Sequence, residues 1–161
     1  MAITQNEKLV FLKKGKEVEA QFAKLFNDAV PASEEEDIKE HWDVKVVTKI
    51  DVKGLRKKNR SDANVDENFH WVELSNVHGG KRTGSLYGMA DYFSFETYDY
   101  FIMVCKLKLQ EFIESKCKGK KLEKTKEPYT LYRRDGRKDI IVKVKTIDLC
   151  YISDKILKKQ K

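Results

Sequence analysis

The segment from His41 to Gly54 reads HWDVKVVTKIDVKG and contains two short runs with the composition of β-strands. Each run carries an aspartate, and Lys53 follows the second aspartate, Asp51, by two residues. Because residues two apart in a strand point to the same face of the sheet, Asp51 and Lys53 share a face. We predict that the two runs form a hairpin that turns near residues 47–49.

The two aspartates, Asp43 and Asp51, are unexpected in strand-like sequence, because aspartate is depleted in strands. Their carboxylate oxygens would suit a hard divalent cation. Lys53 would orient or deprotonate a water molecule, or neutralise charge that develops on a phosphate. The residues therefore favour metal-assisted hydrolysis of a phosphodiester over the alternative that both acids are ordinary surface groups.

An amphipathic helix is predicted upstream, over residues 15–29, with Val18, Phe22 and Leu25 on its apolar face. Glu19 lies about 100° round the helix from Val18, at the margin of that face. A solvated glutamate is the common alternative at such a position. Between this helix and the first strand, Ser33 and Glu36 have the spacing that caps a short helical turn.

The order of a helix with an acid, then Asp43, then Asp51-Val52-Lys53 resembles the PD-(D/E)XK nuclease superfamily. Trp42 stands where the proline of that motif is expected. The resemblance implies an α/β (α+β) fold with a restriction-endonuclease-like core, in which helices flank a mixed central sheet. It also implies Mg²⁺ or Mn²⁺ as cofactor, with Glu19, Asp43 and Asp51 as ligands and Lys53 positioning the attacking water.

A further strand is predicted over residues 69–75, and its Glu73 is a fourth candidate metal ligand. We expect this strand to lie beside the strand that carries Asp51, which would bring Glu73 within reach of the site. The alternative is a surface glutamate that opposes a lysine. Residues 71–79 and 84–91 also resemble small phage-encoded members of the same superfamily.

Basic side chains cluster at three places where they could bind a nucleic-acid backbone. The first two places are the segment after Gly54 and the glycine-rich segment 79–88, and the third is a hairpin turn predicted at Asp135-Gly136. The candidates are Arg56, Lys57, Lys58, Arg60, Lys81, Arg82, Arg133, Arg134 and Arg137. Solvated loops are the alternative for all three clusters.

The remaining segments predict a second hairpin over residues 90–106, a helix over 107–116 and a helix or strand over 146–159.

The 161 residues carry a net charge of +7, which suits an anionic partner without requiring one. We expect one domain, residues 1–161, with a flexible basic tail from about residue 155. The sequence shows no pattern of a signal peptide or membrane span. Its three cysteines have no metal-site spacing, and we expect a cytoplasmic protein.

These features together favour a metal-dependent endodeoxyribonuclease of phage-type recombination or repair, such as one that resolves Holliday junctions. DNA is the expected partner, with RNA left open, and small resolvases of this kind are usually homodimers. The alternatives are a restriction or homing endonuclease and a non-catalytic nucleic-acid-binding module on the same scaffold. A protein-interaction factor whose lysines only confer solubility is a third alternative, and it predicts no salt-dependent DNA binding.

Overall fold

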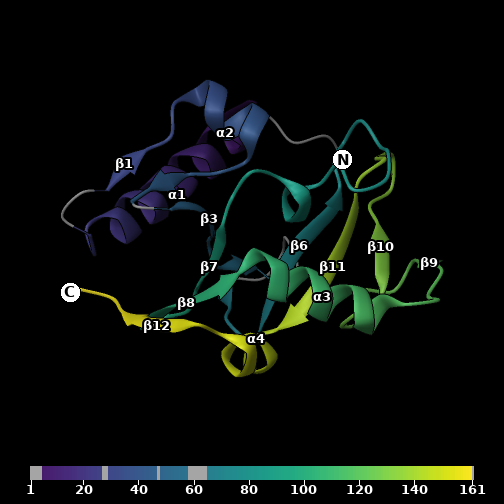
Figure 1. Ribbon diagram of the computed structural model, residues 1–161. Coiled ribbons are helices and arrows are strands. Elements are labelled where there is room, and N and C mark those ends of the chain that lie inside the picture. Colours follow the sequence, from purple (N-terminus) through teal and green to yellow (C-terminus); the bar gives the residue numbers. More distant parts are fainter. Residues whose placement is uncertain (1–4, 27–28, 47, 58–64, 161) are drawn as a thin grey trace.

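The computed structural model describes residues 5–26, 29–46, 48–57 and 65–160 (Figure 1). It is a mixed α+β fold, which confirms the predicted class, and its strands form three sheets. The helices are α1 (Gln5–Ala23), α2 (Glu34–Glu40), α3 (Lys106–Cys117) and α4 (Thr146–Ile152), with a 3₁₀ turn η1 (Ser85–Tyr87). None of the helices in these ranges is long and apolar enough to cross a membrane.

The largest sheet has six strands in the order β1-β2-β3-β7-β8-β12. Their bounds are β1 (Val30–Pro31), β2 (Val44–Lys45), β3 (Lys49–Lys53), β7 (Tyr92–Glu96), β8 (Tyr100–Cys105) and β12 (Lys155–Lys158). Neighbouring strands run antiparallel except β3 and β7, which are parallel. The sheet is therefore mixed, and both predicted hairpins, β2–β3 and β7–β8, are confirmed.

A four-stranded sheet has the order β6-β11-β10-β9. Its strands are β6 (Phe69–Ser75), β11 (Ile140–Lys145), β10 (Leu131–Arg133) and β9 (Leu122–Glu123). The predicted turn at Asp135-Gly136 joins β10 to β11, and Gly136 has a φ of 71°, a conformation that glycine adopts at little cost. A short hairpin of β4 (Arg56–Lys57) and β5 (Val65–Asp66) forms the third sheet.

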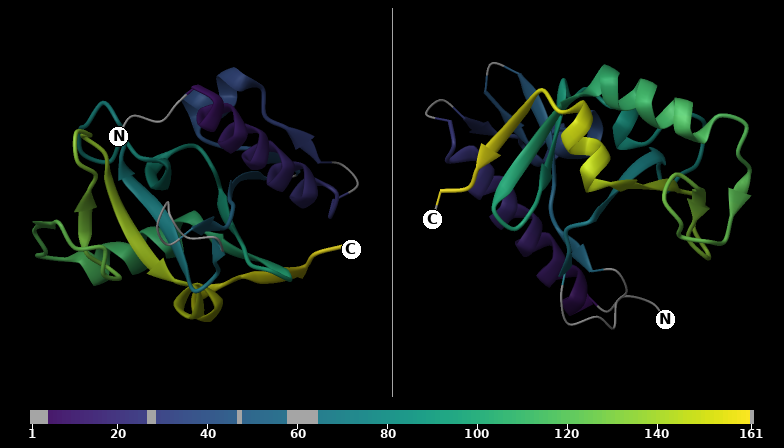
Figure 2. Two further views of the ribbon diagram at one scale, coloured as in Figure 1. Left: turned by 180° about the vertical axis from the view of Figure 1, so that it is seen from behind. Right: turned by 90° about the horizontal axis from the view of Figure 1, so that it is seen from below.

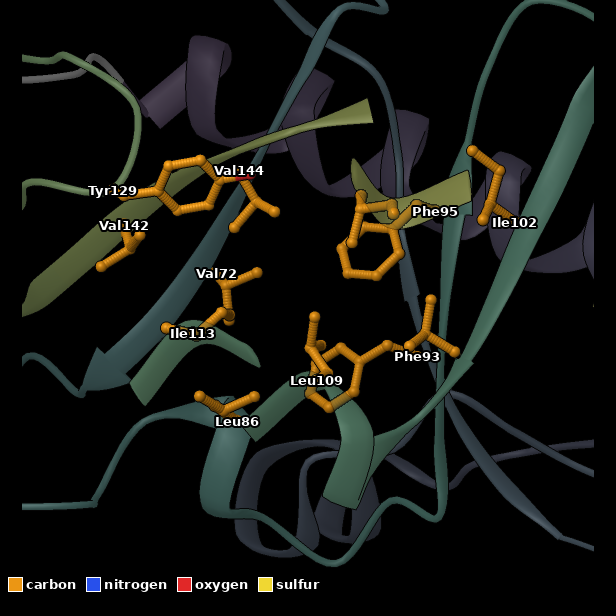
Figure 3. Close-up of a cluster of buried hydrophobic side chains, with 12 residues drawn as sticks. Val72, Leu86, Phe93, Phe95, Ile102, Leu109, Ile113, Tyr129, Val142 and Val144 are labelled. Atoms are coloured by element: carbon orange, nitrogen blue, oxygen red, sulfur yellow. The ribbon is translucent and has the colours of Figure 1, made fainter. Parts of the chain in front are cut away.

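One hydrophobic core joins the two larger sheets (Figure 3). The six-stranded sheet contributes Phe93 and Phe95, and the four-stranded sheet contributes Val72 and Val142. Leu109 and Ile113 of α3 close this core, as do residues of α4 and η1. A single core that spans both sheets fixes how one sheet lies against the other, since well-packed interiors resist sliding.

A second cluster lies on the other face of the six-stranded sheet, beneath α1 (Figure 2). Val18 and Phe22 of the helix pack against Ile50 of β3 and Phe101 of β8. Because side chains alternate along a strand, Asp51 and Lys53 point to the opposite face, toward the core shared with the four-stranded sheet. Helix α1 and the acid–lysine pair therefore lie on different sides of β3.

Helix α1 differs from its predicted range in both directions. It begins at Gln5 and passes through Gly15, and it ends at Ala23 rather than near residue 29. Gly15 does not break the helix, because a glycine inside a helix costs only about 1 kcal/mol relative to alanine. Ser33 caps α2, and the reciprocal hydrogen bonds between Ser33 and Glu36 confirm the predicted capping box.

Gly84 is required by close approach rather than by its backbone angles. A Cβ at this position would lie 2.3 Å from the carbonyl oxygen of Glu73, which is backbone of β6. Gly84→Ala should therefore lower the free energy of unfolding by about 2 kcal/mol or more, because either β6 or the loop must move. Urea denaturation monitored by circular dichroism checks this.

The matched control is Gly15→Ala in α1, where a Cβ would come no closer than 3.7 Å to a side-chain oxygen. It should be neutral or stabilising, because alanine is the better helix former. Equal unfolding free energies for the Gly84→Ala variant and the unchanged protein would contradict the close approach.

Candidate functional site

Asp43 and Asp51 are neighbours at the open end of the β2–β3 hairpin. Asp43 directly precedes β2, whose register with β3 pairs Val44 with Ile50. The Asp43 N–H donates to the carbonyl oxygen of Ile50 at 2.9 Å, and its side chain accepts the Val52 N–H. These bonds bind Asp43 to the backbone on either side of Asp51, close enough for the charge of Asp51 to act on it.

The backbone before Asp43 is held by buried contacts. His41 has a φ of 58°, and the Trp42 side chain is almost fully buried. The indole Nε1–H donates to Glu40 Oε2 at 2.9 Å, and the Lys49 ammonium lies 5.2 Å from the ring centroid. Trp42 therefore anchors the chain directly before Asp43.

Each carboxylate of the pair has one oxygen engaged by the chain itself. The Val52 N–H donates to Asp43 Oδ2 at 2.6 Å, and Lys53 Nζ lies 2.6 Å from Asp51 Oδ1. Among the described residues, Asp43 Oδ1 and Asp51 Oδ2 accept no hydrogen bond. The Lys53 ammonium also lies 5.5 Å from the centroid of the Phe93 ring, which keeps it beside Asp51.

The environment of Asp43 disfavours its negative charge. Burial and the neighbouring charge of Asp51 raise the pKa of Asp43 to about 7, against the smaller opposing effects of the Val52 N–H and the Lys53 ammonium. Glu19 adds a further, weaker repulsion. Asp43 and Asp51 therefore form an acidic pair in a partly desolvated place, where added positive charge would be stabilising.

Glu19 itself lies on α1, on the other side of β3 from Asp51. Its carboxylate is 18% exposed and forms an ion pair with Lys16 at 3.1 Å. Among the side chains that the structure describes, those of residues 13–26, 29–46, 48–56 and 65–160, no group of three or more His, Cys, Asp or Glu is arranged to hold a metal ion. The structure thus brings Asp43, Asp51 and Lys53 into contact range, and Glu19 acts on Asp43 through its charge.

The expected position of Glu73 is wrong. Strand β7, not β6, lies beside β3, and β6 pairs with β11, where Glu73 faces Ile141. Val72 points into the shared core, so Glu73 points to the opposite face of its sheet, away from the six-stranded sheet. The physical reason is that Phe93 and Phe95 make β7 the strand with the apolar face that this place in the core requires.

The basic candidates fall into different surroundings. Arg56 is exposed on β4, whereas only the backbone of Lys57 is described, and Lys58 and Arg60 lie outside the described residues. Arg134 is paired with the fully buried Asp139, with its Nε 2.7 Å from Asp139 Oδ2, so it stabilises the β10–β11 hairpin. The others, Lys81, Arg82, Arg133 and Arg137, are exposed.

Glu96 is a buried acid next to the site that the sequence analysis missed. It ends β7 on the α1 side of the sheet, and its Oε2 accepts the Leu55 N–H at 2.8 Å, directly after Lys53-Gly54. Its Oε1 lies 2.7 Å from the Lys159 ammonium. The only sequence signal was an acid at the end of an aromatic strand. The ion pair of Glu96 with Lys159, together with the Leu55 N–H, holds the C-terminal end of β3 in place.

Lys159→Met should lower the free energy of unfolding by roughly 3 kcal/mol, because it leaves the Glu96 carboxylate buried without its partner. The side chains of Lys159 and Glu96 are only 18% and 9% exposed, so solvent cannot compensate. Thermal and urea unfolding measure the effect. Glu96→Gln in the same chain should restore most of the loss, and the exposed Lys158→Met should change little. A neutral Lys159→Met would show that the pair is not stabilising.

No protein-family model, no curated protein and no solved structure matches the chain.

Proposed function

We propose that the chain is a divalent-metal-dependent nuclease that hydrolyses DNA phosphodiester bonds, with a restriction-endonuclease-like core formed by α1, β2, β3 and β7. The observation that carries the proposal is the neighbouring acids Asp43 and Asp51, the first held by the Val52 N–H and the second paired with Lys53. Buried acids of like charge are costly, and they are found where a charge partner or a reaction uses them.

The donor set fits Mg²⁺ or Mn²⁺. Both metals prefer carboxylate oxygens, and Mg²⁺ is commonly bound by one or two carboxylates together with substrate phosphates. Asp43 Oδ1 and Asp51 Oδ2 would be the ligands, and Glu19, across β3 from Asp51, would act only through its charge on Asp43. The raised pKa of Asp43 supports this assignment, because a cation would relieve the repulsion that raises it.

A bound metal would supply Lewis-acid stabilisation of the charge that builds up on the phosphate. The chain's own contribution is orientation. Asp43 is fixed by the Val52 N–H, so its free oxygen has one direction. Lys53, no longer needed to neutralise Asp51, would donate a hydrogen bond from Nζ to the attacking water or to a phosphate oxygen. Because these groups contact phosphate and not base edges, we expect structure-selective cleavage, as in recombination or repair.

The test is cleavage of labelled single-stranded, duplex, flapped and four-way-junction DNA with Mg²⁺, with Mn²⁺ and with EDTA. We expect cutting that EDTA abolishes, and the preferred substrate identifies the role. No cutting of any substrate, with salt-sensitive binding retained, would favour the second candidate, a binding module. That candidate draws on the ion pair that Lys53 already makes with Asp51, which neutralises the site without a metal.

A further inference from the structure

A groove of about 810 Å³ lies where the glycine-rich loop meets the β10–β11 hairpin, away from the acidic pair. Segments 78–82 and 131–140, far apart in sequence, contribute most of its lining residues. They lie side by side in Figures 1 and 2. A Cβ on Gly79 would lie 3.4 Å from the Lys138 side chain, which shows how closely the loop approaches the hairpin.

The lining has a basic part, which we call the walls, and an apolar part, which we call the floor. Cationic or titratable side chains line the walls, and they are His78, Lys81, Arg82, Arg133 and Lys138. Leu74, Leu131 and Ile140 line the floor, and no carboxylate is among the lining residues that the structure describes. Lys81, Arg133 and Lys138 form no ion pair with any of the residues that the structure describes. The groove therefore attracts an anion and offers it an apolar surface as well.

Arg82 is held in one orientation at the rim. Its backbone has a φ of 55°, its guanidinium lies 2.9 Å from Glu114 Oε1, and its Cζ lies over the Tyr87 ring, 5.3 Å from the centroid. Tyr87 donates its hydroxyl hydrogen to the same carboxylate at 3.0 Å. The Arg82 side chain is 69% exposed, so its guanidinium is held in place and still accessible to a ligand's bases.

We infer that this groove binds single-stranded nucleic acid, with phosphates on the wall cations and unpaired bases on the floor and on Arg82. A duplex turns its phosphates outward and keeps its bases stacked inside, so it cannot place bases on an apolar floor. A volume of this size holds a ligand of one or two nucleotides. The inference goes beyond the proposed cleavage, because it concerns a separate site whose occupation requires no metal.

The test is fluorescence anisotropy of a labelled twelve-residue oligothymidylate in EDTA, so that cleavage plays no part. The groove variant is Lys81→Ala, Arg133→Ala and Lys138→Ala together. The control variant, Lys118→Ala, Lys121→Ala and Lys124→Ala, removes the same charge from an exposed segment outside the groove. We expect binding to weaken at least about 30-fold in the groove variant and less than about 3-fold in the control.

Two further readouts separate the groove from general attraction to polyanions. The salt dependence of binding should fall by about 2 in log–log slope in the groove variant, since each lost phosphate contact contributes about 0.7. An abasic oligomer of equal length should bind about tenfold more weakly than oligothymidylate, because stacking and apolar contacts are lost.

Equal losses in both variants, equal binding of the abasic oligomer, or tighter binding of a hairpin duplex would each overturn the inference. Binding as expected without metal-dependent cutting would instead remove the nuclease proposal and leave the groove.

Discussion

Replacing Asp51 by asparagine is expected to lower the rate of metal-dependent DNA cleavage by at least about 100-fold. The substitution keeps the shape of the side chain but removes the negative charge that acts on Asp43 and pairs with Lys53. Asparagine is a weaker ligand for a hard cation than a carboxylate. The rate is measured with the preferred substrate at saturating Mg²⁺, and the loss should appear in kcat.

The fold of this variant should survive, because the substitution removes the repulsion between Asp51 and Asp43, and Lys53 keeps the nearby carboxylate of Asp43 as an opposite charge. Asp99→Asn is the matched control: it makes the same chemical change at an exposed residue of the β7–β8 turn and should retain full activity. Thermal unfolding of all three proteins separates loss of chemistry from loss of structure. Full cleavage by a folded Asp51→Asn variant would exclude Asp51 from the site.

The hairpin that carries this pair was predictable from the sequence for a physical reason. Strand alternation and a short turn together fix the register of β2 and β3, and Asp43, directly before β2, is thereby brought to the part of β3 that carries Asp51. The turn at Asp135-Gly136 and the capping box at Ser33 were predictable in the same way. All three depend on residues close together in the chain.

The neighbours of these elements depend on contacts between distant residues, and there the predictions failed. Glu73 was expected beside Asp51, but the apolar face of β7 takes that place in the sheet. Residues from about 155 were expected to be a flexible tail, yet β12 pairs antiparallel with β8. The edge of β8 needs a partner for its backbone groups, and the composition of a lysine-rich segment does not show that it will supply one.

Parts of the site also depend on contacts between distant residues and were not predictable. The sequence gives no signal that Lys159 meets Glu96 behind β3, because their contact depends on β12 joining the sheet. In the sequence, the glycine-rich loop and the arginine-rich hairpin are two separate basic segments. They become one groove only because β6 and β11 pair, which brings the ends of both segments to the same edge.

Replacing Asp43 by asparagine is expected to stabilise the metal-free protein above pH 7 while it abolishes cleavage. The pKa of Asp43 is about 7 in the folded protein, and its ordinary value is 3.8. Between these values the unfolded chain has lost the proton that the folded chain still holds, so the free energy of unfolding falls as the pH rises from about 4 to 7. Asparagine is neutral in both states and does not incur this loss.

The stabilising effect of Asp43→Asn should therefore be near zero at pH 4, grow with pH, and level off above pH 7 at about 4 kcal/mol. Urea denaturation in EDTA at several pH values measures it. Glu17→Asn is a suitable control, because it removes one negative charge at an exposed position of α1 and should show no such pH dependence. An effect of the same size at pH 4 and pH 8 would show that ionisation of Asp43 is not its cause.

Mg²⁺ should raise the free energy of unfolding of the unchanged protein more than that of the Asp43→Asn variant. A cation that binds only the folded state stabilises it in proportion to the logarithm of its concentration, and it binds best when Asp43 is ionised. The unchanged protein should therefore gain stability from Mg²⁺ at pH 8 and much less at pH 5, whereas Asp43→Asn should gain little at either pH. If Mg²⁺ stabilises both proteins equally, its site lies elsewhere, and Asp43 destabilises the fold without holding the metal.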